Sequence, residues 1–246
     1  MAAGYTAMNF KSFSFAPELI QALDELNYHT LTPIQRAAIP AVRKGKDVLA
    51  SAQTGTGKTA AFALPIIQKL FESDCSTTNA PSALVLAPTR ELAEQIANNF
   101  KDFAKYTQLK VVSLFGGVST AGQEIALKEG VDVVVATPGR LLDHIRLGNL
   151  SLAQVKHLVL DEADRMLDMG FINDMQSVIK SCADERQILL FSATFPAAIK
   201  QFASKVLKQP EIVRVDQTNS TASTVQHVVY PVEERRKQEL LSELIG

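Results

Sequence analysis

The segment ASAQTGTGKTAAF, at residues 50–62, places two glycines, several small side chains and one lysine between apolar runs. Gly55 and Gly57 allow the chain to curl so that successive backbone N–H groups point at one anion. A helix expected to begin near Lys58 adds its N-terminal dipole, and the lysine adds a full positive charge. The Thr59 hydroxyl is an oxygen ligand that Mg²⁺ accepts. The segment therefore predicts a phosphate-binding loop.

The loop departs from the general pattern G-x-x-x-x-G-K-[ST] at its first position, where Ala52 replaces glycine. The rest of the pattern is intact, between an apolar strand and a helix, so a plain glycine-rich turn is the weaker alternative. The residues that we expect to bind the nucleotide here are Ala52, Gln53, Thr54, Gly55, Thr56, Gly57, Lys58 and Thr59.

A second group of reactive side chains comes from LVLDEAD at residues 158–164. An apolar strand there ends in Asp161 and Glu162, two carboxylates that repel each other unless cations lie between them. Asp161 can hold Mg²⁺ through its waters, and Glu162 can polarise an attacking water molecule. Together with Lys58 they form the candidate catalytic set for phosphoryl transfer to water. A solvated acidic turn is an alternative for this segment alone, and a poor one beside the lysine-bearing loop.

The elements that position these groups alternate along the chain. Short β-branched, apolar runs recur at residues 47–51, 83–88, 110–117, 131–138, 157–164, 187–194 and 211–216. Helical patterns lie between them, for example over 91–105 and over 197–207, where Pro196 is expected at the first helical position. This alternation predicts an α/β fold with a mostly parallel central sheet and helices on both faces.

Each of the first six apolar runs ends in a polar signature, and in chain order these are AQTGTGKT, PTRE, GG, TPGR, DEAD and SAT. Right-handed crossovers place the loops after parallel strands along one edge, where ligands of such sheets bind. Six signatures on one edge indicate a site rather than a set of turns. Ahead of the sheet, residues 10–44 predict two helices opened by Pro17 and Pro33.

With these motifs in order, residues 9–216 resemble the first RecA-like domain of a DEAD-box RNA helicase, closest in style to bacterial RhlE-type members. The resemblance implies a RecA-like P-loop NTPase fold, use of ATP with Mg²⁺, and remodelling of RNA by local strand separation. It divides the chain into domain 1 over residues 1–216, a linker over 217–224 and the beginning of a second RecA-like domain over 225–246, with a strand at 225–232 and a charged helix.

In this family the second domain supplies arginines that stabilise charge on the transferred phosphate, a contribution of about 10³–10⁵ in rate where such residues are measured. None of the later motifs follows residue 216. The resemblance therefore implies that this chain is an N-terminal domain of a longer helicase. By itself it should bind adenine nucleotide weakly and hydrolyse it poorly.

The family also carries an adenine-reading element, which residues 10–35 resemble. By that resemblance, the Gln35 amide pairs with the adenine edge as donor and acceptor, and Tyr28 stacks on the ring. Phe10 matches an isolated upstream aromatic residue of the family, although a core role is at least as well supported by the sequence alone. Two departures are Asn27, which replaces a glycine and tolerates a left-handed turn, and Leu31, which replaces a proline.

Three strand-to-helix turns suit an RNA backbone. Thr89 and Thr137 are plausible N-caps, and arginines follow them that can grip phosphates. Helix N-termini and free backbone N–H groups bind phosphates without a basic surface, which fits a net charge of −1. We expect sequence-independent binding of single-stranded or duplex RNA, with RNA preferred over DNA on the resemblance alone. The residues expected to bind RNA are Pro88, Thr89, Arg90, Gly116, Gly117, Thr137, Pro138, Gly139 and Arg140.

The resemblance further implies that Ser192 and Thr194 hydrogen-bond Asp164 and so couple the nucleotide to the RNA surface. A hydroxyl-capped turn is an equal alternative. Two other functional classes stay open: a different P-loop enzyme, such as a DNA translocase or a nucleotide kinase, and a non-catalytic RNA-binding scaffold.

Composition indicates the cellular compartment that we expect for the protein. Cys75 and Cys182 sit in no metal-like spacing, which is typical of a reducing compartment. The apolar runs fall far short of the about 20 residues that cross a bilayer, and the N-terminal residues show no signal-peptide pattern. We therefore expect a cytoplasmic monomer without a membrane partner.

Overall fold

The computed structural model describes residues 9–53, 55–73, 80–215 and 230–245. Contacts divide the chain into two units, Met1–Val215 and Asp216–Gly246. The first unit carries the sheet and every predicted site residue, and the second contains a short 3₁₀ helix, Glu234–Arg236, followed by α10, Lys237–Ile245.

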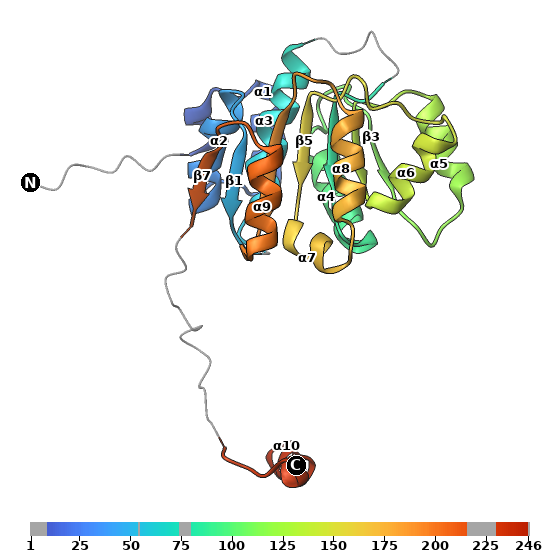
Figure 1. Ribbon diagram of the computed structural model, residues 1–246. Coiled ribbons are helices and arrows are strands. Elements are labelled where there is room, and N and C mark those ends of the chain that lie inside the picture. The colour runs from blue at the N-terminus through green and yellow to red at the C-terminus, as the bar shows by residue number, and fades with distance from the viewer. Residues whose placement is uncertain (1–8, 54, 74–79, 216–229, 246) are drawn as a thin grey trace, which may run out of the picture. The chain divides into compact units, whose positions relative to one another are not determined.

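The first unit is built on a seven-stranded sheet with the order β3-β4-β2-β5-β6-β1-β7 (Figure 1). All six strand pairings are parallel, so the predicted parallel sheet is confirmed. In chain order, β1 to β7 span Val48–Ser51, Ala83–Leu86, Val111–Leu114, Val133–Ala136, His157–Leu160, Gln187–Ser192 and Glu211–Arg214.

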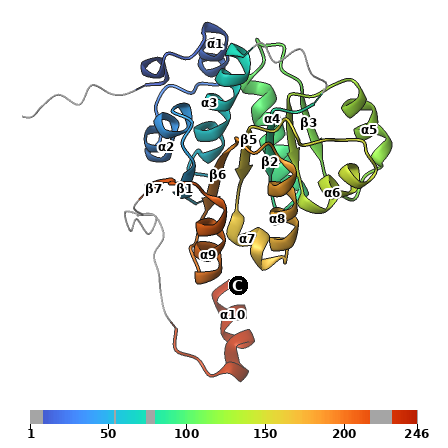
Figure 2. The same ribbon diagram turned by 45° about the horizontal axis from the view of Figure 1, so that its top comes forward.

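Helices connect the strands, as the alternating pattern predicts. After a 3₁₀ helix at Phe10–Phe13, helices α1 to α9 span Pro17–Glu25, Pro33–Arg43, Lys58–Glu72, Arg90–Phe103, Thr120–Lys128, Pro138–Arg146, Ala163–Asp168, Ile172–Ser181 and Ala197–Val206. Figure 2 shows α2 and α3 near β1, whereas α5 and α6 lie near β3. Over the described ranges, no helix combines the length and apolar character needed to span a bilayer.

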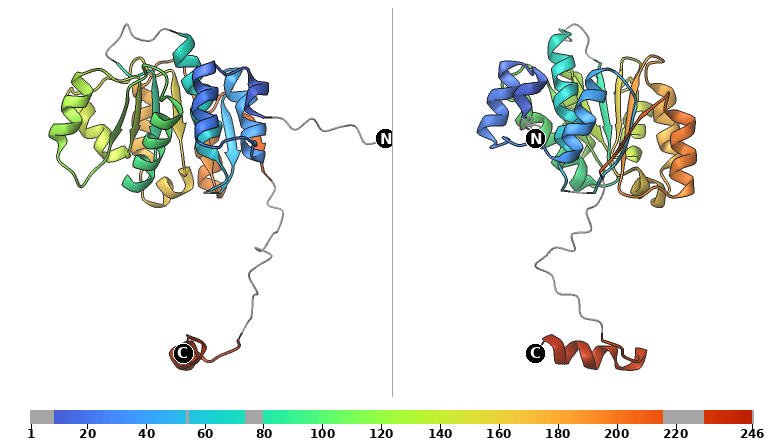
Figure 3. Two further views of the ribbon diagram at one scale, coloured as in Figure 1. Left: turned by 180° about the vertical axis from the view of Figure 1, so that it is seen from behind. Right: turned by 90° about the vertical axis from the view of Figure 1, so that its left-hand side faces the viewer.

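The central strands are buried on both faces, because β2 and β4 are apolar at every position and β5 and β6 carry polar residues only at their ends. Alternate residues of one strand enter different cores. Val85 and Val159 pack with α1 to α4, while Leu84 and Leu158 pack with α6, α8 and α9. The two groups of helices are visible on opposite faces of the sheet in Figure 3. Burial from both sides holds the strand ends rigidly in place, and those ends carry the polar signatures.

The remaining local predictions have mixed outcomes. Pro17 and Pro33 each open a helix as expected. The prediction for Pro196 is wrong by one position, because Pro196 is the N-cap and α9 begins at Ala197. Its extended backbone, with ψ of 163°, lies outside the helical region. The predicted linker at 217–224 lies outside the described residues. So does most of the predicted strand at 225–232, and its described part, 230–232, is not in a strand.

The edge where the strands begin is held by a buried polar group centred on Gln187. Its Nε2 donates to the carbonyls of Val42 and Lys46, at 3.0 and 2.6 Å. This fixes the orientation of the amide, so Oε1 accepts from Lys69 Nζ at 3.2 Å and from His157 Nδ1 at 3.3 Å. Burial, followed by the charge of Lys69, lowers the pKa of His157 to about 4. The folded protein therefore holds this ring uncharged.

Replacing His157 with asparagine should make the fold less sensitive to acid. A histidine whose pKa falls from 6.5 to about 4 on folding stabilises the fold fully only above pH 6.5, and that contribution is lost as the pH falls toward 4. The loss reaches about 3 kcal/mol in free energy of unfolding. Asparagine keeps a donor near the Nδ1 position and does not titrate.

Urea unfolding at about pH 7 and about pH 4.5 measures this effect. His29→Asn is the matched control, because His29 is exposed. Wild type and the control should lose more stability on acidification than His157→Asn, and equal losses in all three would show that His157 does not carry the effect.

Candidate functional site

The strand order arranges all six polar signatures along one edge of the sheet. The lysine-bearing loop follows β1, SAT follows β6 and DEAD follows β5, and these three strands are neighbours. PTRE follows β2, TPGR follows β4 and GG follows β3 on the other half of the sheet. The prediction of a common edge is confirmed. The DEAD segment lies at the boundary between the two halves, because β5 pairs with both β6 and β2.

The loop after β1 has the backbone that its glycines predict. Gly55 and Gly57 have φ of 83° and 87°, in the left-handed region, and α3 begins at Lys58. A Cβ on Gly57 would lie 2.5 Å from Gln35 Nε2, whereas a Cβ on Gly55 would meet nothing within 4 Å. Glycine is therefore favoured at position 57 by contact as well as by conformation.

Other predicted members of the loop have separate roles in its shape. Ala52 is buried, and its N–H donates to the carbonyl of Ser192 on β6 at 3.1 Å. The Thr56 hydroxyl donates to the carbonyl of the exposed Gln53 at 2.7 Å. Thr54 lies outside the described residues.

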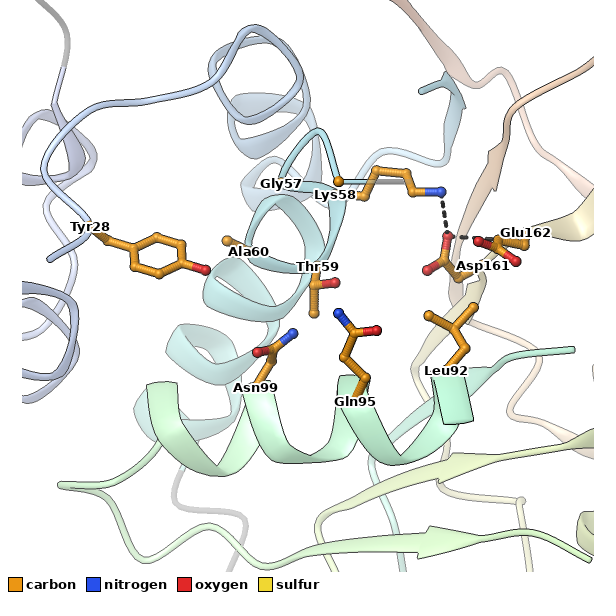
Figure 4. Close-up of a pocket in the computed structure, with 11 residues that line it drawn as sticks. Tyr28, Gly57, Lys58, Thr59, Ala60, Leu92, Gln95, Asn99, Asp161 and Glu162 are labelled. Carbon is orange, nitrogen blue, oxygen red and sulfur yellow. Dashed lines mark hydrogen bonds and ion pairs between the residues drawn. The ribbon is translucent and has the colours of Figure 1, made fainter. Parts of the chain in front are cut away.

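Lys58 and Asp161 meet at the centre of the site (Figure 4). Lys58 Nζ lies 3.3 Å from Asp161 Oδ1, and the two side chains are 5% and 2% exposed. Asp161 Oδ1 also accepts the Glu162 N–H at 3.0 Å. Burial raises the pKa of Asp161, and the nearby charge of Lys58 opposes that rise. Lys58 Nζ has no hydrogen-bond partner among the described residues. The site thus holds a buried cation that can accept a further anionic partner.

Glu162 occupies a strained position directly after Asp161. Its φ and ψ are 52° and 50°, the left-handed conformation, at the N-cap of α7. For a non-glycine residue this costs about 1–3 kcal/mol and is frequent at functional sites. The side chain is 12% exposed, and its Oε2 lies 3.4 Å from Arg165 Nη1. Glu162 also helps to line the neighbouring pocket.

A pocket of about 180 Å³ lies beside the ion pair. Its walls include α4 residues that the sequence interpretation missed. Figure 4 shows Gln95 and Asn99 directed from α4 toward the start of α3. Their spacing with Leu92, at i, i+3 and i+7, places all three on one helix face and could have revealed them. The lining residues are Tyr28, Gly55, Gly57, Lys58, Thr59, Ala60, Leu92, Gln95, Asn99, Asp161 and Glu162.

Gln35 does not line this pocket, although it contacts the phosphate loop. It is only 1% exposed, and both ends of its amide are engaged within the protein. Oε1 accepts from the Thr32 N–H at 2.9 Å, and Nε2 donates to the Gly57 carbonyl at 3.1 Å. The adenine-reading segment and the phosphate loop therefore form one connected structure.

The two aromatic residues predicted to contact adenine differ in exposure. Tyr28 is 36% exposed and lines the pocket. Phe10 is 3% exposed and belongs to the core, with its ring centroid 6.3 Å from that of Tyr28. The structure thus places Phe10 behind Tyr28. Asn27 adopts the left-handed turn expected of it, with φ of 59°, and Leu31 is buried in the core.

The three turns predicted to bind RNA contact one another. Thr89 caps α4 by accepting the Leu92 N–H at 3.3 Å, whereas Thr137 stands at the N-cap of α6 without a side-chain cap hydrogen bond. Pro88 and Pro138 are buried and Gly139 is exposed. Arg140 Nη1 donates to the Val118 carbonyl at 3.2 Å, and the Arg90 guanidinium lies 5.1 Å from the centre of the Phe115 ring. Gly116 and Gly117, between those two partners, are exposed.

The SAT segment contacts the DEAD segment through Thr194. The Thr194 N–H and hydroxyl both donate to Asp164 Oδ2, at 2.8 and 2.7 Å. The Ser192 hydroxyl donates to the Thr194 carbonyl at 2.7 Å. Burial alone would raise the pKa of Asp164, but the hydrogen bonds that its carboxylate accepts, those from Thr194 first, outweigh burial and lower the pKa. Asp164 is therefore held as a carboxylate by the neighbouring strand end.

Comparison with known proteins identifies the family of this chain. A family model described as "DEAD/DEAH box helicase" matches residues 32–202. The chain belongs to the DEAD/DEAH box helicase family. It is 40% identical to the DEAD-box ATP-dependent RNA helicase CshA of Bacillus subtilis over 97% of this chain and 47% of that protein. It is 43% identical to the ATP-dependent RNA helicase DeaD of Escherichia coli over 94% of this chain and 36% of that protein.

Solved structures agree with this assignment. A DEAD box protein from Methanococcus jannaschii has a TM-score of 0.79 at 36% identity, over 97% of this chain and 63% of that one. A hypothetical ATP-dependent RNA helicase from Sulfolobus tokodaii has a TM-score of 0.73 at 35% identity, over 80% and 56%. The predicted RecA-like fold is confirmed. This helicase-family chain spans about half or less of the length of its curated relatives CshA and DeaD. The finer likeness to RhlE-type members stays a prediction.

Substituting alanine for Gly57 should disrupt the site more than the same change at Gly55. Both glycines have nearly the same positive φ, so both variants carry similar backbone strain. Only the Gly57 variant also forces Gln35 and Thr32 aside. We expect Gly57→Ala to be less stable than Gly55→Ala by about 1–3 kcal/mol in urea unfolding, the usual cost of overpacking. Equal stabilities would mean that the Gln35 contact yields freely.

Proposed function

We propose that this chain is the ATP- and RNA-binding domain of a DEAD-box ATP-dependent RNA helicase. The observation that carries the proposal is the buried ion pair of Lys58 and Asp161, in which Nζ lies 3.3 Å from Oδ1. This ion pair lies on the same sheet edge as three turns that are suited to binding phosphate. The names of the relatives CshA and DeaD support the reaction, and they are the reason for choosing RNA. Such an arrangement suits an enzyme that uses a triphosphate to change its grip on a nucleic acid backbone.

The residues of the nucleotide site fit ATP with Mg²⁺. Lys58 offers a buried ammonium group that is ion-paired with Asp161 but has no hydrogen-bond partner among the described residues, so a phosphate would supply one. Asp161 and the Thr59 hydroxyl supply the oxygen ligands that Mg²⁺ prefers. No three His, Cys, Asp or Glu side chains gather at one point in the described chain, which suits a metal held largely by phosphates and waters. When bound, Mg²⁺ neutralises charge on the phosphates.

In this proposal the protein groups divide the work. The N–H groups of the loop at Gly55 and Gly57, with Lys58, hold and orient the phosphates. Glu162 accepts hydrogen bonding from the attacking water and directs it at the outer phosphate. Gln35 and Tyr28 select adenine from the other end of the site. The contact of Gln35 Nε2 with the Gly57 carbonyl links base recognition to the phosphate loop.

The RNA surface of this proposal is the half of the edge formed by β2, β4 and β3. Gly116 and Gly117 expose their backbone, and Arg90 and Arg140 stand on either side of them. These donors contact sugar and phosphate, which carry no sequence information. The pairing of Thr194 with Asp164 supports the proposed coupling, because it joins the strand end beside the nucleotide to the DEAD segment.

We further propose that full activity requires a second RecA-like domain. Coverage of at most about half of CshA and DeaD supports this view. The activity of the whole protein would be strand separation driven by ATP.

Nucleotide binding by this chain tests the first part of the proposal. Lys58→Ala should weaken binding of a fluorescent ATP analogue, in the presence of Mg²⁺, by at least about tenfold, since a charge-assisted contact is lost. Lys205→Ala, an exposed lysine on α9, is the control and should bind as wild type does. Unchanged affinity of the Lys58 variant would remove the lysine-bearing loop from the site.

Turnover tests the role of Glu162. In the protein that includes the second domain, Glu162→Gln should keep ATP affinity and lose about 10²–10⁴ in RNA-stimulated hydrolysis, the usual contribution of a general base. Glu185→Gln, an exposed residue ahead of β6, should retain full turnover. Comparing RNA with DNA of the same sequence distinguishes the helicase from a DNA translocase, and equal stimulation by both would contradict the proposed preference.

A further inference from the structure

The loop Gly116–Gly117 is fixed from both sides by residues of the neighbouring turns. On one side, the Phe115 ring lies beneath the guanidinium of Arg90 at 5.1 Å. On the other, the Val118 carbonyl accepts from Arg140 at 3.2 Å. The glycines are exposed and have no side chain to pack, and Gly117 has φ of 80°. Their position depends on these flanking contacts.

A third contact reaches the loop from inside the protein. Gln123 on α5 donates from Nε2 to the Phe115 carbonyl at 3.1 Å. Its Oε1 lies 3.1 Å from Nε2 of His144 on α6, and His144 Nδ1 lies 3.4 Å from Asn149 Nδ2. Gln123 is 8% exposed and His144 is fully buried. These side chains form a polar chain between two helices in an otherwise apolar core.

The donor-to-acceptor direction of these hydrogen bonds follows from the last acceptor, the Phe115 carbonyl. A carbonyl can only accept, so Gln123 must present Nε2 to Phe115 and Oε1 to His144. His144 must then carry its proton on Nε2, and its Nδ1 accepts from Asn149. Burial, followed by the charge of Arg140, lowers the pKa of His144 and keeps the ring neutral. One consistent set of hydrogen bonds therefore runs from Asn149 to the Phe115 carbonyl.

We propose that Gln123 and His144 are positioning residues for RNA binding, which fix the Gly116–Gly117 loop against the turn of Arg140. A buried polar chain costs stability unless all its members are satisfied, and an apolar pair would fill the space between α5 and α6 at lower cost. What the polar chain adds is a defined position for one carbonyl, that of Phe115. A defined loop presents its N–H groups to a phosphate without an ordering cost at binding.

The inference rests on the proposed RNA function for its affinity readout, and a readout without RNA separates the two. Gln123→Leu removes the contact with the Phe115 carbonyl. Gln68→Leu is the matched control, because Gln68 is also a buried, hydrogen-bonded glutamine but lies on α3. The double variant Gln123→Leu/His144→Leu also removes the His144 N–H that the single variant leaves unpaired, so it should recover part of the lost stability.

Three measurements on the protein test the proposal: urea stability, the affinity for fluorescent single-stranded oligouridine, and NMR order parameters of the Gly116 and Gly117 amides. Gln123→Leu should bind RNA about tenfold more weakly, with the order parameters falling from about 0.85 toward 0.6. Gln68→Leu should lose stability but keep the wild-type RNA affinity and glycine order parameters. The double variant should regain part of the stability lost in Gln123→Leu without regaining RNA affinity.

Two results would overturn the inference. In one, RNA affinity follows stability across the variants, as a merely structural role requires. In the other, the glycine order parameters stay at the wild-type value in Gln123→Leu. If wild type itself fails to bind RNA, the proposed function fails instead, and the order parameters still judge the positioning role of Gln123.

Discussion

The buried ion pair between Lys58 and Asp161 is the constraint on which the site depends. A charge this deep in a protein is tolerated only with a partner, and removing one member leaves the other uncompensated. Here the two members follow β1 and β5, which are separated by β6 alone. The sheet must therefore hold three strand ends in fixed register for the pair to form. In return, the pair keeps an ammonium group in the low-dielectric site, where its charge acts most strongly on a phosphate.

The same strand order would let one edge serve the two ligands of the proposed function. Lys58 and Thr194 lie in the segments that follow the adjacent strands β1 and β6, and Arg90, Arg140 and Gly116 follow the strands on the other side. β5 lies between the groups, and its Asp161 N–H donates to the Leu86 carbonyl of β2 at 3.0 Å. A small shift of the DEAD segment would be transmitted to both halves of the sheet edge, because the close-packed cores on each face leave the strands little freedom to absorb that shift.

Sequence predicts what depends on local chemistry and fails where tertiary partners decide. The apolar strands, the loop glycines and the cap at Thr89 are local, and their positions in the sequence are as expected. The strand order could not be predicted, since parallel strands of similar apolar character can be permuted without changing any local preference. Gln95 and Asn99 were missed for a related reason: their one signal, a helix face shared with Leu92, is common to amphipathic helices and indicates a site only once α3 lies beside it.

The sequence also gives no warning that the predicted ligand-binding groups bind the protein first. The Gln35 amide is hydrogen-bonded to Thr32 and Gly57, and Arg140 donates to the Val118 carbonyl. Each of these groups keeps spare capacity, because an amide has two donor hydrogens and a guanidinium has five. An internal contact removes rotamer freedom before the ligand arrives, so the ordering cost is met during folding. Weak net charge is then compatible with phosphate binding, since orientation replaces the excess of cations that a flexible surface would need.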